Sequence, residues 1–178
     1  MNQVRIIAGK YGGRLIDTPK NRATHPMGDR EKQAIFNRLR HHLAESRVLD
    51  AFAGSGALGI EALSEGAEHV DFLEKDRKAI LTIISNLEKL QIPPERAKIV
   101  PSISLLDTRQ SYDVILADPP YDKPQYSKIV ELVELLGSGG IFVLSHPKNQ
   151  TPPNFPKLNL LSDRSYGAAQ IKIYQSIF

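Results

Sequence analysis

The sequence predicts an α/β protein with a doubly wound sheet of about seven strands, mostly parallel and closed by a C-terminal antiparallel hairpin. From residue 47 onward, short apolar runs alternate with segments of helical periodicity, which is the pattern of βαβ units. Near the end, two β-rich runs flank Tyr166-Gly167, a turn signal between neighbouring strands. Residues 1–46 lack this alternation and predict a small N-terminal extension made of a β-hairpin and a helix.

In the extension, residues 4–18 have extended character, and Tyr11-Gly12-Gly13 is expected to turn them into a hairpin. Residues 19–28 contain two prolines and a glycine and predict a loop. A helix is expected from Asp29, acting as its cap, to Glu45. The apolar residues that recur there at helical spacing are Ile35, Phe36, Leu39 and Leu43.

The remaining residues, 47–178, form one predicted domain in which strands and helices alternate. Strands are expected over Val48–Phe52, Val70–Glu74, Ile99–Val100, Tyr112–Ala117, Ile141–Leu144, Leu158–Leu161 and Gln170–Tyr174. Helices are expected over Leu58–Glu65, Arg77–Leu90 and Tyr126–Leu136. Residues 147–156 contain four prolines and predict a loop.

The composition excludes several classes of protein. The chain of 178 residues has the size of one domain, and its 41% of hydrophobic residues are enough for a core. It contains no Cys, so disulfides, thiolate metal sites and Cys nucleophiles are excluded. No apolar run has the roughly 20 residues of a membrane helix, and the His residues show no metal-ligand spacing. We therefore expect a cytoplasmic monomer without a membrane segment or a metal.

Positive charge is concentrated at the N-terminal end of the chain. Residues 1–47 contain ten Lys and Arg against four acids, a net charge of +6, whereas the whole chain carries +3. A basic end on a near-neutral body indicates a polyanionic partner, and charge alone is equally compatible with a solvated face. Tyr11 can either stack on RNA or belong to the core. The candidate RNA-binding residues are Arg5, Lys10, Arg14, Arg22 and Arg30.

The segment from Asp50 to Gly59 places a G-x-G-x-x-G pattern at a predicted strand-to-helix junction. Such a loop lets a ligand approach the backbone and offers free N–H groups, and the spacing alone is compatible with NAD. Asp50 suits an ammonium group, however, and Glu74 suits ribose hydroxyls, which together describe S-adenosylmethionine. A purely structural turn is the alternative. The candidate cofactor-binding residues are Asp50, Phe52, Ala53, Gly54, Ser55, Gly56, Glu74, Lys75 and Ser102.

Asp118-Pro119-Pro120-Tyr121 follows directly after a predicted buried strand, where ligands bind in open α/β sheets. The prolines leave carbonyl oxygens as acceptors without N–H donors, and Asp118 adds a further acceptor. Two acceptors can hold an exocyclic NH₂ and turn its lone pair toward a methyl carbon, while Tyr121 can stack on a base. Asp118, Pro119, Pro120 and Tyr121 are therefore the predicted catalytic residues, acting mainly by positioning because a sulfonium is already a strong electrophile. An ordinary Pro-rich turn is the alternative interpretation.

Several segments together give the chain a family resemblance. They are residues 5–14, 35–37 and 48–62, Glu74-Lys75-Asp76, Asp118 to Tyr121, and Tyr166-Gly167. In these segments the chain resembles the RsmD-type family of bacterial 16S rRNA guanine-N2 methyltransferases. The resemblance implies a Rossmann-like class I S-adenosylmethionine-dependent methyltransferase domain over residues 47–178, preceded by an RNA-contacting extension over residues 1–46. It also implies that the substrate is a guanine amino group of 16S rRNA, within a partly assembled small ribosomal subunit.

Three segments depart from the usual pattern of that family. His25-Pro26-Met27 replaces Arg-Pro-Thr before the first helix, residues 101–105 lack an acid for the adenine, and Ser145-His146 stand where a Glu is usual. Amino-methylation of adenine N6 or of a protein glutamine is an alternative, because the same motif serves those reactions. A non-catalytic RNA-binding assembly factor is a second alternative, and an NAD enzyme is a third. Binding of S-adenosylmethionine separates the assembly factor from a methyltransferase, and titration with NADH tests for the NAD enzyme.

Overall fold

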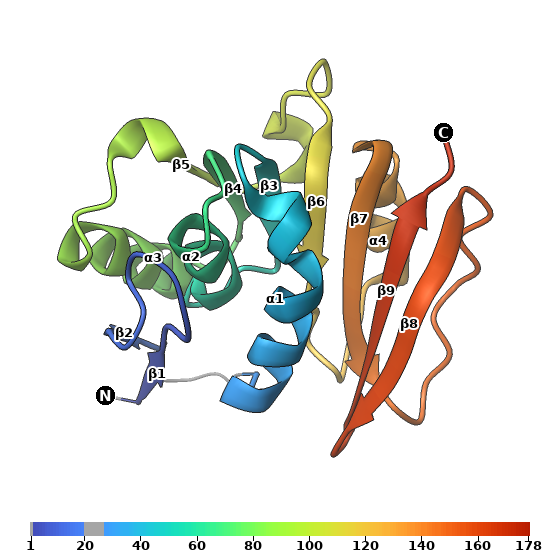
Figure 1. The fold of residues 1–178 in the computed structure, drawn as a ribbon, viewed down its shortest axis with the longest axis horizontal. Coiled ribbons are helices and arrows are strands. Elements are labelled where there is room, and N and C mark those ends of the chain that lie inside the picture. Colours follow the sequence, from blue (N-terminus) through green and yellow to red (C-terminus); the bar gives the residue numbers. More distant parts are fainter. Residues whose placement is uncertain (1, 20–26) are drawn as a thin grey trace.

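The central sheet of the computed structural model, which describes residues 2–19 and 27–178, has the strand order β5-β4-β3-β6-β7-β9-β8 (Figure 1). The parallel strands are β3 (Arg47–Ala51), β4 (His69–Leu73), β5 (Ala97–Val100), β6 (Tyr112–Ala117) and β7 (Leu136–Pro147). β8 (Leu158–Tyr166) and β9 (Ala169–Ser176) form an antiparallel hairpin beside β7. The predicted mostly parallel sheet with a C-terminal antiparallel hairpin is confirmed.

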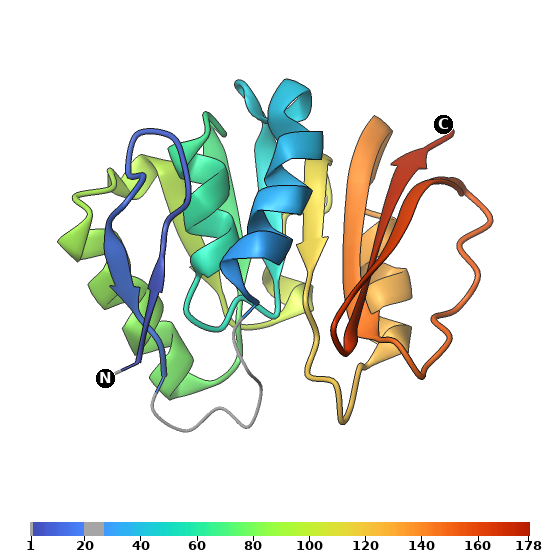
Figure 2. The ribbon, with the colours of Figure 1, turned by 60° about the horizontal axis from the view of Figure 1, so that its bottom comes forward.

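Helices cover both faces of this sheet (Figures 1 and 2). One face carries α1 (Asp29–Leu43), α2 (Ala57–Ser64) and α3 (Arg77–Lys89), and the other carries α4 (Tyr126–Val133). Two short 3₁₀ turns, Pro94–Arg96 and Ile103–Leu105, flank β5. Alternate strand residues point to opposite faces, so each face of the sheet packs against its own apolar cluster. Among the described residues, no helix has both the length and the apolar character needed to cross a membrane.

The N-terminal strands β1 (Gln3–Arg5) and β2 (Leu15–Asp17) form a separate two-stranded antiparallel sheet, which lies against α2 and α3 (Figure 2). Ile6 and Ile16 are fully buried in the same apolar cluster as α1, α2 and α3. Gly9 has a positive φ of 76°, and a Cβ atom there would lie 1.9 Å from the backbone oxygen of Ser64 on α2. The hairpin is therefore seated on α2 by a backbone approach that only glycine permits.

The five parallel strands end together at one edge of the sheet. Their pairing aligns Ala51 with Leu73 and Ala117, Leu73 with Val100, and Ala117 with Leu144. The chain runs from β3 outward to β5 and then returns to β6 on the other side of β3, so the direction of winding changes between β3 and β6. Ligands of open α/β sheets bind in the crevice at such a point. The fold thus brings the glycine loop after β3 next to the Asp-Pro-Pro-Tyr segment after β6.

Several predicted element boundaries are wrong: β7 and β8 are longer than predicted, and the start of α1 and the end of α4 also differ. Asp29 does not cap α1: Gly28 holds the cap position without a side-chain hydrogen bond, and Asp29 is the first helical residue. A carboxylate in the first turn still interacts favourably with the helix dipole. The predicted helix from Tyr126 ends at Val133 rather than at Leu136, which instead begins β7 and pairs with Tyr112.

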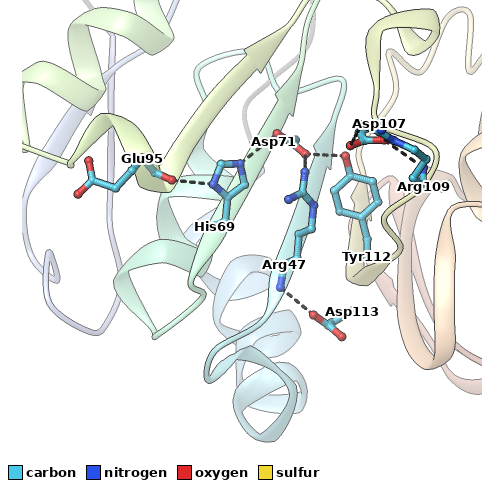
Figure 3. Close-up of polar contacts among 8 residues, drawn as sticks. All are labelled: Arg47, His69, Asp71, Glu95, Asp107, Arg109, Tyr112 and Asp113. Atoms are coloured by element: carbon cyan, nitrogen blue, oxygen red, sulfur yellow. Dashed lines mark hydrogen bonds and ion pairs between the residues drawn. The ribbon is translucent and has the colours of Figure 1, made fainter.

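A buried polar network joins the amino ends of β3, β4 and β6, at the edge opposite the crevice (Figure 3). The carboxylate of Asp71, which is 1% exposed, accepts hydrogen bonds from Arg47 Nη2 and from the Tyr112 hydroxyl, each at 2.6 Å. His69 Nε2 lies 3.1 Å from the other oxygen of Asp71. A buried carboxylate is tolerated only with such partners, and here they tie the three strands together.

The pH dependence of stability tests this network. The hydrogen bond to Asp71 raises the pKa of His69 above its usual value, against the opposing effect of burial. The stability that protonated His69 gains from Asp71 is therefore fully present below the pKa of unfolded His, about 6.5. It is lost as pH rises through the higher folded-state pKa. We expect His69→Gln to lower the free energy of unfolding by about 1 kcal/mol near pH 6 and by less near pH 9. Denaturant titrations at both pH values measure this loss of stability, with exposed His41→Gln as the control. A loss that is independent of pH would contradict the prediction.

Candidate functional site

Two cavities lie side by side at the carboxyl edge of the parallel strands. The larger has a volume of about 660 Å³ and the smaller of about 530 Å³. Phe52 and Pro120 line both cavities, so these two residues stand between them. Since one comes from the loop after β3 and the other from the loop after β6, the partition lies where the winding of the sheet changes direction.

The glycine loop after β3 is held by two buried carboxylates. Glu74 accepts a hydrogen bond from Gly54 N at 2.8 Å through one oxygen, and from the backbone N–H groups of Lys75 and Asp76 at 2.9 Å through the other. Asp50 accepts a hydrogen bond from Gly59 N at 2.8 Å. Asp50 is 2% and Glu74 6% exposed. The two acids predicted to bind a cofactor therefore also fix the backbone of the loop.

Close packing and backbone conformation explain the residues of this loop. Gly56 precedes α2 with a φ of 78°, and a Cβ atom on Gly59 would lie 2.4 Å from the ring of Phe72. The third glycine of the motif therefore allows α2 to pack closely on β4. Phe52 has a positive φ of 62°, which is unusual for a residue with a side chain. Such a conformation persists where the surroundings enforce it, often at ligand sites.

The predicted cofactor-binding residues are distributed over both cavities. Glu74, Lys75 and Ser102 line the smaller cavity, Asp50, Ala53 and Ser55 line the larger, and Phe52 lines both. Gly54 and Gly56 lie in the loop itself and line neither.

The residues of the smaller cavity fit an adenosine. Leu73, Pro101 and Ile103 offer apolar surface for a base, and Glu74 is a carboxylate of the kind that binds ribose hydroxyls. Residues 101–105 have no acid, but Glu131 of α4 reaches the same cavity. Asp50, in the adjoining larger cavity, suits an ammonium group. The residues that line the two cavities therefore fit S-adenosylmethionine.

All four residues of the Asp-Pro-Pro-Tyr segment line the larger cavity: Asp118, Pro119, Pro120 and Tyr121. The hydroxyl of Tyr121 lies 2.8 Å from Ser145 Oγ on β7, and burial raises the pKa of this tyrosine, so it stays protonated and hydrogen-bonded. Gln150 donates a hydrogen bond to the Tyr121 backbone oxygen at 3.3 Å and accepts one from Tyr126 at 3.3 Å. The segment after β6 is thus braced from β7 and from the loop that follows it.

The opposite walls of the larger cavity come from the two ends of the chain. The N-terminal extension contributes Thr18, Pro19 and the start of α1, including Glu31 and Lys32. The turn between β8 and β9 contributes residues 166–169. β9 runs antiparallel to β7, so this turn reaches the same edge of the sheet at which β6 ends. Tyr166-Gly167, predicted as the turn of the C-terminal hairpin, therefore lies beside the predicted catalytic segment.

The predicted RNA-binding residues Arg5, Lys10, Arg14 and Arg30 are all exposed. Lys10 Nζ and the Arg14 guanidinium lie 5.5 and 5.8 Å from the centre of the Tyr11 ring. Tyr11 is only 3% exposed, so it belongs to the core and is not available to stack on RNA. Arg22, His25 and Pro26 lie outside the described residues, and Met27 lines the larger cavity.

Sequence inspection missed the buried polar residues that join the extension to the rest of the fold. They are Lys32 on α1, Glu61 and Ser64 on α2, and Asn86 on α3. The available signal was a polar residue on an apolar helix face, since Asn86 follows Ala79 and Ile83 at helical spacing. Within the described part of the chain, no three His, Asp or Glu residues gather closely enough to hold a metal ion.

The hydrogen bonds of Glu74 lead to a prediction for cofactor affinity. Glu74→Ala removes the acceptor of three backbone N–H groups and the carboxylate of the smaller cavity. We expect the dissociation constant of S-adenosylhomocysteine to rise about 10- to 100-fold, the equivalent of one charge-assisted hydrogen bond. Calorimetry measures the change, with exposed Lys98→Ala on β5 as the control. Unchanged affinity in Glu74→Ala would remove this residue from the cofactor site.

Comparisons with known proteins agree with this geometry. The family model described as Conserved hypothetical protein 95 matches residues 4–175. Ribosomal RNA small subunit methyltransferase D of Haemophilus influenzae is 32% identical over 98% of this chain and 94% of its own length. The Escherichia coli protein of that name is 30% identical over 97% of this chain and 90% of its own. A solved structure from Escherichia coli, described as that of a candidate methyltransferase, superposes with a TM-score of 0.83 at 29% identity and covers 99% of both chains. The chain therefore belongs to the Conserved hypothetical protein 95 family, the family of these ribosomal RNA small subunit methyltransferase D relatives.

Proposed function

We propose that this protein transfers a methyl group from S-adenosylmethionine to the exocyclic N2 of a guanine in 16S rRNA. The observation that carries the proposal is the pairing of two adjoining cavities. One contains Glu74 and suits an adenosine, and the other is walled by Asp118 to Tyr121 and suits a base. The names of the relatives support ribosomal RNA of the small subunit as the substrate.

In the proposed reaction the cofactor supplies an electrophilic methyl group on sulfur. The carboxylate of Asp118 and the carbonyl oxygen of Pro119 accept the two N–H bonds of the guanine amino group, which directs the nitrogen lone pair at the methyl carbon. The N–C bond forms as the S–C bond breaks, leaving S-adenosylhomocysteine, and the nitrogen then releases one proton to solvent. Tyr121, fixed through Ser145, supports the plane of the base. The protein thus contributes position rather than a strong base.

The RNA partner follows from the same site. A guanine paired within a helix cannot present its amino group to a cavity, so the target is flipped or single-stranded. Residues 1–46, which include the exposed Arg5, Lys10 and Arg14, form the RNA-contacting extension, and residues 47–178 carry out the transfer. The substrate is a partly assembled small ribosomal subunit, and the protein acts on it as a monomer in the cytoplasm.

The test is methyl transfer from labelled S-adenosylmethionine to small-subunit particles from cells that lack this protein. Nucleoside analysis of the purified 16S rRNA is expected to place the label in N2-methylguanosine. Label in N6-methyladenosine, in DNA or in protein would contradict the guanine assignment and favour another amino-methyltransferase. Binding of the particles without binding of S-adenosylhomocysteine would instead indicate a non-catalytic assembly factor.

A further inference from the structure

Asn86 occupies a position where the pattern of α3 calls for an apolar residue. It follows Ala79 and Ile83 on the face of α3 that packs on the sheet, and it is 0% exposed. Burying a side-chain amide destabilises a fold unless its donors and acceptor are satisfied. The partners of this amide therefore show what the residue contributes.

The amide of Asn86 joins two segments that are far apart in sequence. Its Oδ1 accepts a hydrogen bond from Asp17 N at 2.9 Å, and its Nδ2 donates to the Asp17 backbone oxygen at 2.9 Å. The same Nδ2 donates a second hydrogen bond to the backbone oxygen of Ser55 at 3.0 Å. One buried side chain thus binds the end of β2 on one side and the glycine loop after β3 on the other.

Both segments lead directly to the larger cavity. Asp17 ends β2, and the next two residues, Thr18 and Pro19, line that cavity. Ser55 lines it from the opposite part of the chain, within the loop predicted to bind the cofactor. Asn86 therefore connects the end of β2 directly to the backbone of the glycine loop.

The surrounding contacts make the hairpin and the loop one unit. On α2, which begins directly after the loop, Glu61 accepts hydrogen bonds from the N–H groups of Ile7 and Ala8 at 2.9 Å. Ser64 Oγ accepts one from Tyr11 N at 2.9 Å. On α3, Lys89 Nζ lies 3.6 Å from the Asp17 carboxylate. The RNA-contacting hairpin is thus fastened to the two helices that flank the glycine loop.

We infer that Asn86 is a positioning residue that couples the N-terminal hairpin to the cofactor loop, so that RNA and cofactor strengthen each other's binding. The inference rests on the proposed function for the identity of the two ligands. A ligand that fixes the position of either segment also fixes the other through Asn86, and such coupling is necessarily reciprocal. Asn86 lines neither cavity and would act only through the backbones of Asp17 and Ser55.

The first measurement concerns the cofactor alone. Calorimetry with S-adenosylhomocysteine is carried out on the wild type, on Asn86→Ala, and on Ser46→Ala as the matched control. Ser46 is also buried and donates a hydrogen bond to the Leu43 oxygen at 2.7 Å, but it precedes β3 at the opposite edge of the sheet. We expect Asn86→Ala to weaken binding about tenfold, since Ser55 loses its partner, and Ser46→Ala to bind like the wild type. Wild-type affinity in Asn86→Ala would overturn the link to the cofactor loop.

The second measurement concerns the coupling. The affinity for S-adenosylhomocysteine is determined with and without saturating small-subunit particles from cells that lack the protein. We expect the particles to tighten wild-type and Ser46→Ala binding by about fivefold or more, and to have little effect on Asn86→Ala. Absence of coupling in the wild type, or wild-type coupling in Asn86→Ala, would overturn the inference.

A second variant and a stability measurement distinguish loss of coupling from misfolding. Asn86→Asp keeps the volume and the acceptor for Asp17 N but removes both donated hydrogen bonds, so it is expected to show the same loss of coupling. Thermal melting of each variant against Ser46→Ala separates loss of coupling from loss of stability. Failure of the proposed function has a different signature: a wild-type protein that binds S-adenosylhomocysteine but leaves the particles unmethylated. The effect of Asn86→Ala on the affinity for S-adenosylhomocysteine can be interpreted whether or not the particles are methylated.

Discussion

Asp118→Ala is expected to slow methyl transfer to small-subunit particles by about 100-fold or more, the scale on which one preorganised polar contact acts in an enzyme. Asp118 follows the last residue of β6 and lines the larger cavity next to Pro119 and Pro120. Without its carboxylate, one N–H bond of the target amine loses its acceptor, and the nitrogen lone pair is no longer held toward the methyl group. The affinity for S-adenosylhomocysteine should change much less than the rate, because Glu74 and Asp50, the two acids assigned to the cofactor, are unaltered in this variant.

Asp118→Asn is the matched control for this prediction. The amide keeps one carbonyl acceptor of the same length, so this variant should retain a measurable fraction of the activity that the alanine variant loses. Single-turnover rates with saturating cofactor measure the transfer step itself. Full activity in Asp118→Ala would remove Asp118 from the mechanism, and equal loss of cofactor affinity would assign it to cofactor binding instead.

The strands that form the crevice could be predicted because their signals are local. Tyr112 to Ala117 is an apolar run that ends at an acid and two prolines, and β6 has these same bounds. Asp50 to Gly59 carries its own glycine pattern, which the close approach of Gly59 to Phe72 explains. The parallel direction of these strands follows from the alternation of strands and helices.

Features that depend on pairing between distant segments could not be predicted. β7 begins at Leu136, which pairs with Tyr112, and regular pairing with β6 and β9 resumes at Ile141. The three glycines between them have low strand propensity and lie where the register with β6 shifts. Pro147, expected in a loop, pairs with Ala169. No local pattern indicates that the turn after Tyr166 meets the Asp-Pro-Pro-Tyr segment, because their proximity arises only when β9 pairs with β7.

The attachment of the N-terminal hairpin to α2 could not be predicted for the same reason. Glu61 reads as an ordinary acid on a short helix, and Lys32 as part of a charged helix face, yet they are 0% and 1% exposed. Their burial depends on Gly9, which lets the hairpin approach the backbone of Ser64. A basic N-terminal segment was therefore visible in the sequence, and its rigid attachment to α2 was not.

Replacement of Glu61 should have the largest effect on stability. We expect Glu61→Ala to lower the free energy of unfolding by about 3 kcal/mol, because it leaves two part-buried N–H groups without their acceptor and removes the carboxylate beside a buried cation. That cation, Lys32, keeps the Arg5 backbone oxygen and the Asp29 carboxylate as partners. The N–H groups are those of Ile7 and Ala8, and Lys32 Nζ lies 3.9 Å from the carboxylate. Glu65→Ala, a more exposed acid at the end of the same helix, is the control. Denaturant titration measures both, and equal effects would contradict a special role for Glu61.

The same carboxylate gives a pH dependence whose sign can be stated. Burial raises the pKa of Glu61, and its hydrogen bonds from Ile7 and Ala8 only partly oppose this. Because the pKa of Glu61 is higher in the folded state, protonation of Glu61 favours folding. This contribution to stability is fully present below the pKa of unfolded Glu, about 4.3, and is lost as pH rises through the folded-state pKa. Glu61→Gln cannot ionise, so its stability relative to the wild type should increase as pH rises over that interval.

Because the hairpin carries Arg5, Lys10 and Arg14, Glu61→Ala should also weaken particle binding at temperatures where residues 47–178 are still folded. Retained particle affinity with a melted hairpin would show that the basic extension does not contact RNA.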